Sequence, residues 1–150
     1  IRVSRIPVVK QAMGWVASGP EQPLVEDACM QFSSHASGDV AFGPDGYLYA
    51  SAGDGASYDT EDWGQAGNPC GDPLDEGGSL RSQDLRTSGD PLSLSGSTFR
   101  VDKATGLAPN GTNSNAARIV THGQRNPWRL TFRPGTDELW SGDVGNSGWE

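Results

Sequence analysis

The chain has 150 residues, and 11 Lys and Arg against 19 Asp and Glu give it a formal net charge of −8. The absence of a basic patch argues against nucleic-acid binding, and no apolar run approaches the ~20 residues that span a bilayer. The 21 Gly and 10 Pro argue against a helical bundle, and the 12 aromatic residues argue against a disordered chain.

The first third of the chain is predicted to contain a strand, a loop and a hairpin. Residues 1–10 alternate apolar and polar side chains, which predicts a strand already under way where the sequence begins. Residues 11–37 show little periodicity and contain Gly-Pro and Gln-Pro, so we expect a loop. The run 39–42 and the strand 47–52 flank the segment 43–46, whose Gly-Pro-Asp-Gly sequence is typical of a tight turn.

A long Gly-, Asp- and Ser-rich segment follows this hairpin. Residues 53–95 show no clear element, and so long an irregular segment is unusual in a compact domain. We therefore expect residues 1–150 to be part of a single domain, with an inserted functional or stapled loop at about 55–95. Further strands are predicted at 97–102, 118–121, 129–132 and 138–141.

An internal repeat organises these strands. Phe42 and Phe132 lie 90 residues apart, as do Pro44 and Pro134, and each unit is strand, turn, strand and Gly/Asp-rich loop. Propeller blades take about 40–50 residues, so this spacing fits either two blades or one blade plus the long loop. The pattern predicts an all-β propeller, of which the chain is a partial segment of roughly three blades.

Two cysteines occur, Cys29 and Cys70, both in polar, loop-like surroundings. Without a CxxC motif they cannot form a structural zinc site alone. A disulfide that clamps the long loop is favoured and would indicate an oxidising compartment. Two free thiols are the alternative.

The pattern around His35 points to acid–base chemistry. His35 lies on a loop just before a strand, and a neutral imidazole can act as a base near pH 7. Asp54 ends the other strand of the same hairpin, so it can return to His35 and orient its ring. A catalytic His35–Asp54 pair is one interpretation. A surface histidine and a turn aspartate are the other, since Gly-Asp-Gly is itself a good turn.

Two further groups suggest ligands. Arg125 and Asn126 precede a stiffening proline, which suits recognition of an oxygen-rich anion, although the pattern alone favours side chains that satisfy loop carbonyls. The loop 143–148 is acidic and rich in backbone carbonyls, which Ca²⁺ prefers, but it does not fit an EF-hand. The acidic segments 59–62 and 72–76 are expected to be solvated surface.

Together these motifs resemble the soluble quinoprotein glucose/sorbosone dehydrogenase family over about residues 35–150. In order they are His35-x-x-Gly38-Asp39-Val40-Ala41-Phe42-Gly43-Pro44-Asp45-Gly46-Tyr47-Leu48-Tyr49, Gly53-Asp54-Gly55, Gly123-Gln124-Arg125-Asn126-Pro127-Trp128 and Trp140-Ser141-Gly142-Asp143-Val144-Gly145. The resemblance implies a six-bladed β-propeller that binds pyrroloquinoline quinone (PQQ) and Ca²⁺ at one end of its channel and oxidises sugars.

The resemblance also implies roles for residues. His35 matches the base that takes the proton from the sugar hydroxyl as hydride passes to the quinone, and Asp54 matches the carboxylate that supports this base. Arg125 and Asn126 match residues that touch the carboxylate and quinone oxygens of the cofactor.

For the metal, Gly145 and Asn146 match positions whose backbone carbonyls hold Ca²⁺.

The chain departs from the family pattern at two positions. Ser34 stands where some members carry an acid beside the base, and Gln124 replaces a common histidine.

The resemblance implies a PQQ- and Ca²⁺-dependent oxidoreductase that acts on a sugar hydroxyl, with an electron acceptor as its second partner. We expect a secreted or periplasmic protein, with other domains in a longer chain. One alternative is a non-catalytic extracellular propeller that serves as a binding module. A weaker alternative is a propeller glycosidase with Asp54 and Asp143 as its carboxylate pair.

Overall fold

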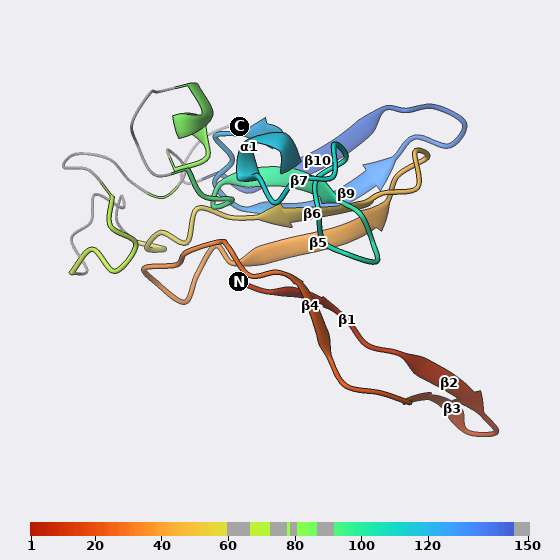
Figure 1. The fold of residues 1–150 in the computed structure, drawn as a ribbon. Helices are drawn as coiled ribbons and strands as arrows, with labels where there is room; N and C mark the ends of the chain where they lie inside the picture. Colours follow the sequence, from red (N-terminus) through yellow and green to blue (C-terminus); the bar gives the residue numbers. More distant parts are fainter. Residues whose placement is uncertain (60–66, 73–77, 79–80, 87–91, 146–150) are drawn as a thin grey trace.

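The computed structural model describes residues 1–59, 67–72, 78, 81–86 and 92–145, and it consists mainly of antiparallel strands (Figure 1). The described residues contain one α-helix, α1 (Asn115–Arg118), and a 3-10 turn, η2 (Gln83–Arg86), and no helix among them could cross a membrane. The strands of the two sheets that frame the site are β5 (Ser37–Phe42), β6 (Leu48–Ala52), β7 (Ser97–Val101), β8 (Ile119–His122), β9 (Pro127–Phe132) and β10 (Leu139–Asp143). The all-β prediction is confirmed.

The strands form a four-stranded sheet of order β5–β6–β7–β8 and a separate hairpin of β9 and β10. Each strand of the larger sheet is antiparallel to its neighbour, and β6 is buried along its whole length. The predicted turn at 43–46 connects β5 to β6, where Gly46 takes a positive φ of 82° that favours glycine.

The 90-residue repeat is explained by this topology. The β5–β6 hairpin and the β9–β10 hairpin are its two copies, and β7, β8 and the long loop separate them. The second alternative, one four-stranded sheet plus the loop, therefore describes the repeat. The two hairpins are joined by polar contacts: the Ser51 hydroxyl donates to the Pro127 carbonyl at 2.8 Å, and the Leu130 amide donates to the Asp39 carboxylate at 3.2 Å.

Four short strands at the start of the chain form a ribbon that projects from the sheet (Figure 1). They are β1 (Val3–Arg5), β2 (Val8–Gln11), β3 (Gly14–Ala17) and β4 (Gln22–Val25), with β1 paired to β4 and β2 to β3. The predicted single strand at 1–10 is thus broken around Pro7, and the predicted loop at 11–37 is wrong at β3 and β4. Strands of four residues are too short to show a clear alternation.

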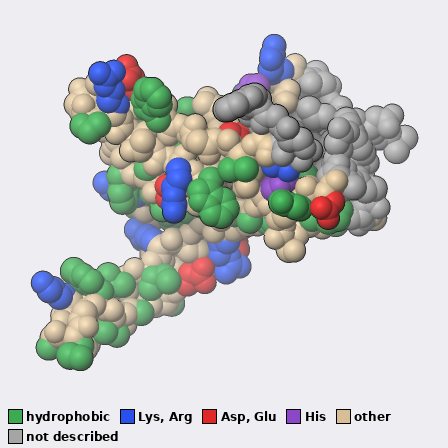
Figure 2. Space-filling view, turned by 180° about the vertical axis from the view of Figure 1, so that it is seen from behind, with side chains coloured by type: hydrophobic (Ala, Val, Ile, Leu, Met, Phe, Trp, Pro, Cys, Tyr) green, Lys and Arg blue, Asp and Glu red, His purple; other side chains and the backbone are tan. Residues whose placement is uncertain are grey.

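The two ends of this ribbon have different surroundings. Its base packs against the large sheet, where Val3, Leu24 and Val25 join Phe99 and Val101 in the main hydrophobic core. Its tip exposes apolar side chains on both faces, which Figure 2 shows as hydrophobic atoms along the projecting arm. The base therefore anchors the segment that leads into the site.

The long loop is stapled, as predicted. Cys29 and Cys70 form a disulfide, which fixes the loop to the segment before β5. The expectation that 72–76 is solvated surface is wrong at Asp72, which is buried in an ion pair with Arg81, while 73–77 lie outside the described residues. Asp59 is exposed as expected, and 60–62 also lie outside the described residues.

Removal of this disulfide is expected to destabilise the fold. Because the bridge joins residues 41 positions apart, the chain-entropy relation gives a loss of up to about 4 kcal/mol in the free energy of unfolding for Cys29→Ser with Cys70→Ser. Urea denaturation of the double variant and the parent measures the loss. A reducing agent should lower the midpoint of the parent and leave that of the variant unchanged, and equal sensitivity of both would contradict the bridge.

Candidate active site

One end of the large sheet collects the predicted site residues. In an antiparallel arrangement, the start of β5, the end of β6, the start of β7 and the end of β8 all lie at the same edge. The start of β9 and the end of β10 lie next to this edge, because β9 packs against β5. His35, Asp54, Arg125 and Asn126 all belong to the connections at this edge, so topology brings them together.

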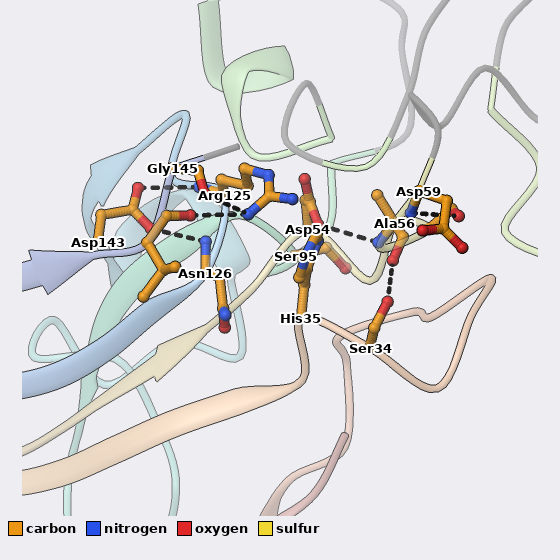
Figure 3. A network of polar contacts seen from close by, with 12 residues as sticks. Ser34, His35, Asp54, Ala56, Asp59, Ser95, Arg125, Asn126, Asp143 and Gly145 are labelled. Atoms are coloured by element: carbon orange, nitrogen blue, oxygen red, sulfur yellow. Dashed lines mark hydrogen bonds and ion pairs between the residues drawn. The ribbon is translucent and has the colours of Figure 1, made fainter. Parts of the chain in front are cut away.

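His35 and Asp54 are in direct contact. His35 Nδ1 lies 2.9 Å from Asp54 Oδ1, and each residue is only 7% exposed. The Ala56 amide donates to the same carboxylate oxygen at 2.9 Å. Figure 3 shows this pair at the centre of the polar network, with Arg125 and Asp143 on one side and Ser34 and Ala56 on the other. Of the two interpretations of the sequence, a surface histidine does not describe this geometry.

The backbone at this contact is tight. His35 takes a positive φ of 48°, which is uncommon for a residue with a side chain and costs about 1–3 kcal/mol. The Gly53 amide donates to the Ala36 carbonyl at 2.7 Å, and the Gly55 amide donates to the His35 carbonyl at 3.2 Å. A Cβ on Gly53 would lie 2.1 Å from the His35 carbonyl oxygen, so only glycine fits there.

Burial governs the charge of Asp54. Loss of water contact raises the pKa of its carboxyl, while hydrogen bonds from the Ala56 amide and His35, and the nearby charge of Arg125, act in the opposite direction. Once ionised, the carboxylate accepts the proton on His35 Nδ1. The other ring nitrogen, Nε2, then carries the lone pair that a general base needs.

The segment before β9 is fixed by Asp143 at the end of β10. The Arg125 amide donates to one carboxylate oxygen of Asp143 at 2.9 Å, and the Asn126 amide donates to the other at 2.6 Å. The Asp54 amide in turn donates to the Arg125 carbonyl at 2.8 Å. Both oxygens of Asp143 are thus used to hold these amides, which leaves the carboxylate pair of the glycosidase alternative without support.

The side chains of Arg125 and Asn126 differ in their partners. The Arg125 guanidinium donates to the carbonyls of Val144 and Gly145 at 2.9 and 3.1 Å, and it is only half-buried. Within the described part of the chain the side-chain amide of Asn126 makes no hydrogen bond. Arg125 therefore satisfies loop carbonyls, as the alternative interpretation expected, while the Asn126 amide offers a donor suited to an oxygen-rich anion.

Of the two predicted calcium ligands, the structure describes only Gly145. Gly145 lies at the site, but its carbonyl already accepts from Arg125, and Asn146 lies outside the described residues. The part of the chain that the structure describes contains no cluster of three or more His, Cys, Asp or Glu side chains. Calcium binding through the two carbonyls therefore stays a prediction.

Sequence reasoning missed Asp72 and Arg81. Arg81 is 3% exposed and donates from Nη1 to the Asp54 carbonyl at 3.0 Å, so it belongs to the surroundings of the site. Both residues lie in the long loop, where no periodicity marks a residue as buried. The loop holds two arginines, Arg81 and Arg86, and several acids, so the sequence does not single out this pair.

Two comparisons place this geometry among known proteins. A family model described as glucose/sorbosone dehydrogenase matches residues 23–150. A crystal structure from Thermus thermophilus, of a protein provisionally described as an oxidoreductase (glucose dehydrogenase), superposes with a TM-score of 0.53 at 22% identity. The match covers 93% of this chain and 34% of that one, so this chain spans about a third of its length. No curated protein matches.

At this identity the second comparison shows the fold alone. The expected partial segment of an all-β propeller is confirmed.

The close approach at Gly53 gives a stability prediction. Gly53→Ala is expected to lower the free energy of unfolding by about 1–3 kcal/mol, because its Cβ has no room beside the His35 carbonyl. Gly142→Ala is the matched control, since nothing lies within 4 Å of its Cβ position. Urea denaturation compares the two variants, and equal midpoints would contradict the described contact.

The raised pKa of Asp54 gives a pH prediction. The folded protein holds this proton more tightly than the unfolded chain, so the contribution of Asp54 to stability is fully present below pH 3.8 and is lost as pH rises through the raised pKa. Asp54→Asn cannot ionise, so its free energy of unfolding should rise relative to that of the parent as pH rises through this window. Urea denaturation at several pH values measures the difference.

Asp102 provides a control of opposite sign. The hydroxyl and amide of Thr105 lower its pKa, so the stability it provides is present above pH 3.8 and is lost as pH falls through the lowered pKa. The free energy of unfolding of Asp102→Asn should therefore fall relative to that of the parent as pH rises. A pH-independent difference for Asp54→Asn would overturn the assignment of Asp54 as a buried acid.

Proposed function

This chain belongs to the glucose/sorbosone dehydrogenase family, and we propose that it carries the base and part of the cofactor site of a PQQ- and Ca²⁺-dependent sugar dehydrogenase. The observation that carries the proposal is the buried contact between His35 and Asp54. A buried carboxylate on one ring nitrogen of a histidine is a recurring device for preparing the other nitrogen to take a proton.

The donor set beside this pair supports the cofactor assignment. When bound, the quinone supplies the acceptor for the two electrons that leave the sugar carbon as hydride. The Arg125 guanidinium would hold carboxylate oxygens, and the Asn126 amide, which has no partner among the described residues, would donate to a further oxygen. If Ca²⁺ is present, the carbonyls of Gly145 and Asn146 are its proposed ligands on this chain.

The protein groups then perform the proton transfer. His35 Nε2 takes the proton from the sugar hydroxyl while the carbon that bears this hydroxyl loses hydride, so the product is a carbonyl compound. Asp54 accepts the Nδ1 proton and stabilises the imidazolium that forms. The Ala56 amide donates to the Asp54 carboxylate and the Asp54 amide donates to the Arg125 carbonyl, so both the side chain and the backbone of Asp54 are held during this transfer.

The disulfide supports a location for the protein. Disulfides persist in oxidising compartments, and Cys29 is bonded to Cys70. We propose a secreted or periplasmic protein. Its second partner would be an electron acceptor that takes electrons from the reduced cofactor.

The direct test is reconstitution. The protein expressed from its complete reading frame is mixed with PQQ and Ca²⁺, and turnover of several aldoses is followed with an artificial electron acceptor. Turnover that depends on both additions is expected. The absence of both cofactor binding and turnover would contradict the enzyme proposal and favour a non-catalytic binding module.

The role of His35 has its own prediction. His35→Ala should lower kcat by about 10²–10⁴-fold because the base is lost, while PQQ binding, followed by absorbance, should persist. Asn126→Ala is the contrasting variant and should weaken PQQ binding first. Loss of both binding and turnover in His35→Ala would count against a role as base.

A further inference from the structure

A described part of the long loop lies directly against Asp54. A Cβ on Gly78 would lie 2.0 Å from the Asp54 carbonyl oxygen, so the two backbones are in contact. The Ser82 hydroxyl donates to the Gly96 carbonyl at 2.8 Å, which joins the same segment to the residue before β7. Gly78, Arg81 and Ser82 therefore lie against the end of the sheet where the site lies.

Arg81 is the central side chain of this segment. It is 3% exposed, its guanidinium pairs with both carboxylate oxygens of Asp72, and its Nη1 donates to the Asp54 carbonyl at 3.0 Å. Removing an arginine from water is expensive unless it is fully hydrogen-bonded. A simple surface loop does not require a buried ion pair. The position of the Arg81–Asp72 pair against Asp54 therefore needs an explanation.

The contact completes a set of restraints on Asp54. Its amide donates to the Arg125 carbonyl, its carbonyl accepts from Arg81, and its side chain accepts from Ala56 and His35. The backbone of Asp54 is therefore held on both sides by side-chain or loop groups from outside its own hairpin. Holding the backbone fixes where the carboxylate meets the imidazole.

Asp72 is itself anchored. Its amide and carbonyl are both hydrogen-bonded to the side chain of Asn68, at 2.9 and 2.7 Å, and it lies two residues after Cys70. The Cys29–Cys70 bridge ties this turn to the segment before β5, where the amide of Phe32 donates to the Gly55 carbonyl. The anchor of Arg81 is thus covalently linked to the segment that carries His35.

We propose that Arg81 is a positioning residue, held by Asp72, that keeps Asp54 in line with His35. The proposal rests on the proposed function, since it assigns Arg81 to the same proton-transfer site. Arg81 does not reach the reacting atoms in this assignment. It acts through the Asp54 carbonyl.

The test compares two buried arginines in the protein expressed from its complete reading frame. Arg81→Met removes the contact with Asp54. Arg118→Met is the matched control, because Arg118 is 6% exposed and also holds a backbone carbonyl, that of Gly106, but belongs to α1. Hydrogen exchange of the peptide 53–57 and steady-state kinetics are measured for both, and urea denaturation checks that both fold.

Arg81→Met is expected to speed exchange at the amides of Gly55 and Ala56 and to lower kcat by about 10- to 100-fold without a change in KM. Arg118→Met should change neither. If Arg81→Met does not fold, Arg81→Lys replaces it and should give a smaller change in the same direction, because it keeps one donor and the charge opposite Asp72. Exchange and kcat equal to those of the control would overturn the proposal.

The two proposals fail in different ways. If the parent protein oxidises no sugar, the proposed function fails, while hydrogen exchange still decides whether Arg81 positions Asp54. If the parent is active and Arg81→Met matches the Arg118→Met control in both measurements, only the positioning role fails.

Discussion

A carboxylate removed from water at the end of β6 is the constraint on which the rest of the site depends. Asp54 is 7% exposed, and burial raises its pKa, so it can stay ionised only where donors compensate for the lost water. The imidazole of His35 and the amide of Ala56 supply these donors. The same hydrogen bond that stabilises the acid therefore fixes the proton on Nδ1 of the histidine.

The antiparallel architecture makes this contact possible. An antiparallel sheet brings the residue before one strand next to the residue after its neighbour, so His35 and Asp54 meet although 19 positions separate them. Glycines at 53 and 78 let the flanking backbones approach closely enough to exclude water. The β9–β10 hairpin adds the half-buried cation of Arg125, and the long loop adds Arg81.

Features set by local pattern could be predicted from the sequence, and features set by distant contacts could not. Alternation predicted β7, and Pro-Asp-Gly predicted the turn after β5, because both depend on a few adjacent residues. The proximity of His35 and Asp54 followed from the geometry of a hairpin. No pattern in the polar loop marks Asp72 and Arg81 as an ion pair. The strands β3 and β4 are too short to show a period.

The central claim is that Asp54 holds the proton of His35 Nδ1 in a buried hydrogen bond. Nuclear magnetic resonance of protein with ¹⁵N-labelled histidine tests it most directly, at a pH where Asp54 is ionised. The account predicts a proton resonance on His35 Nδ1 that is protected from exchange with water and disappears in Asp54→Ala. A rapidly exchanging Nδ1 proton, or a protected one that persists in Asp54→Ala, would contradict it.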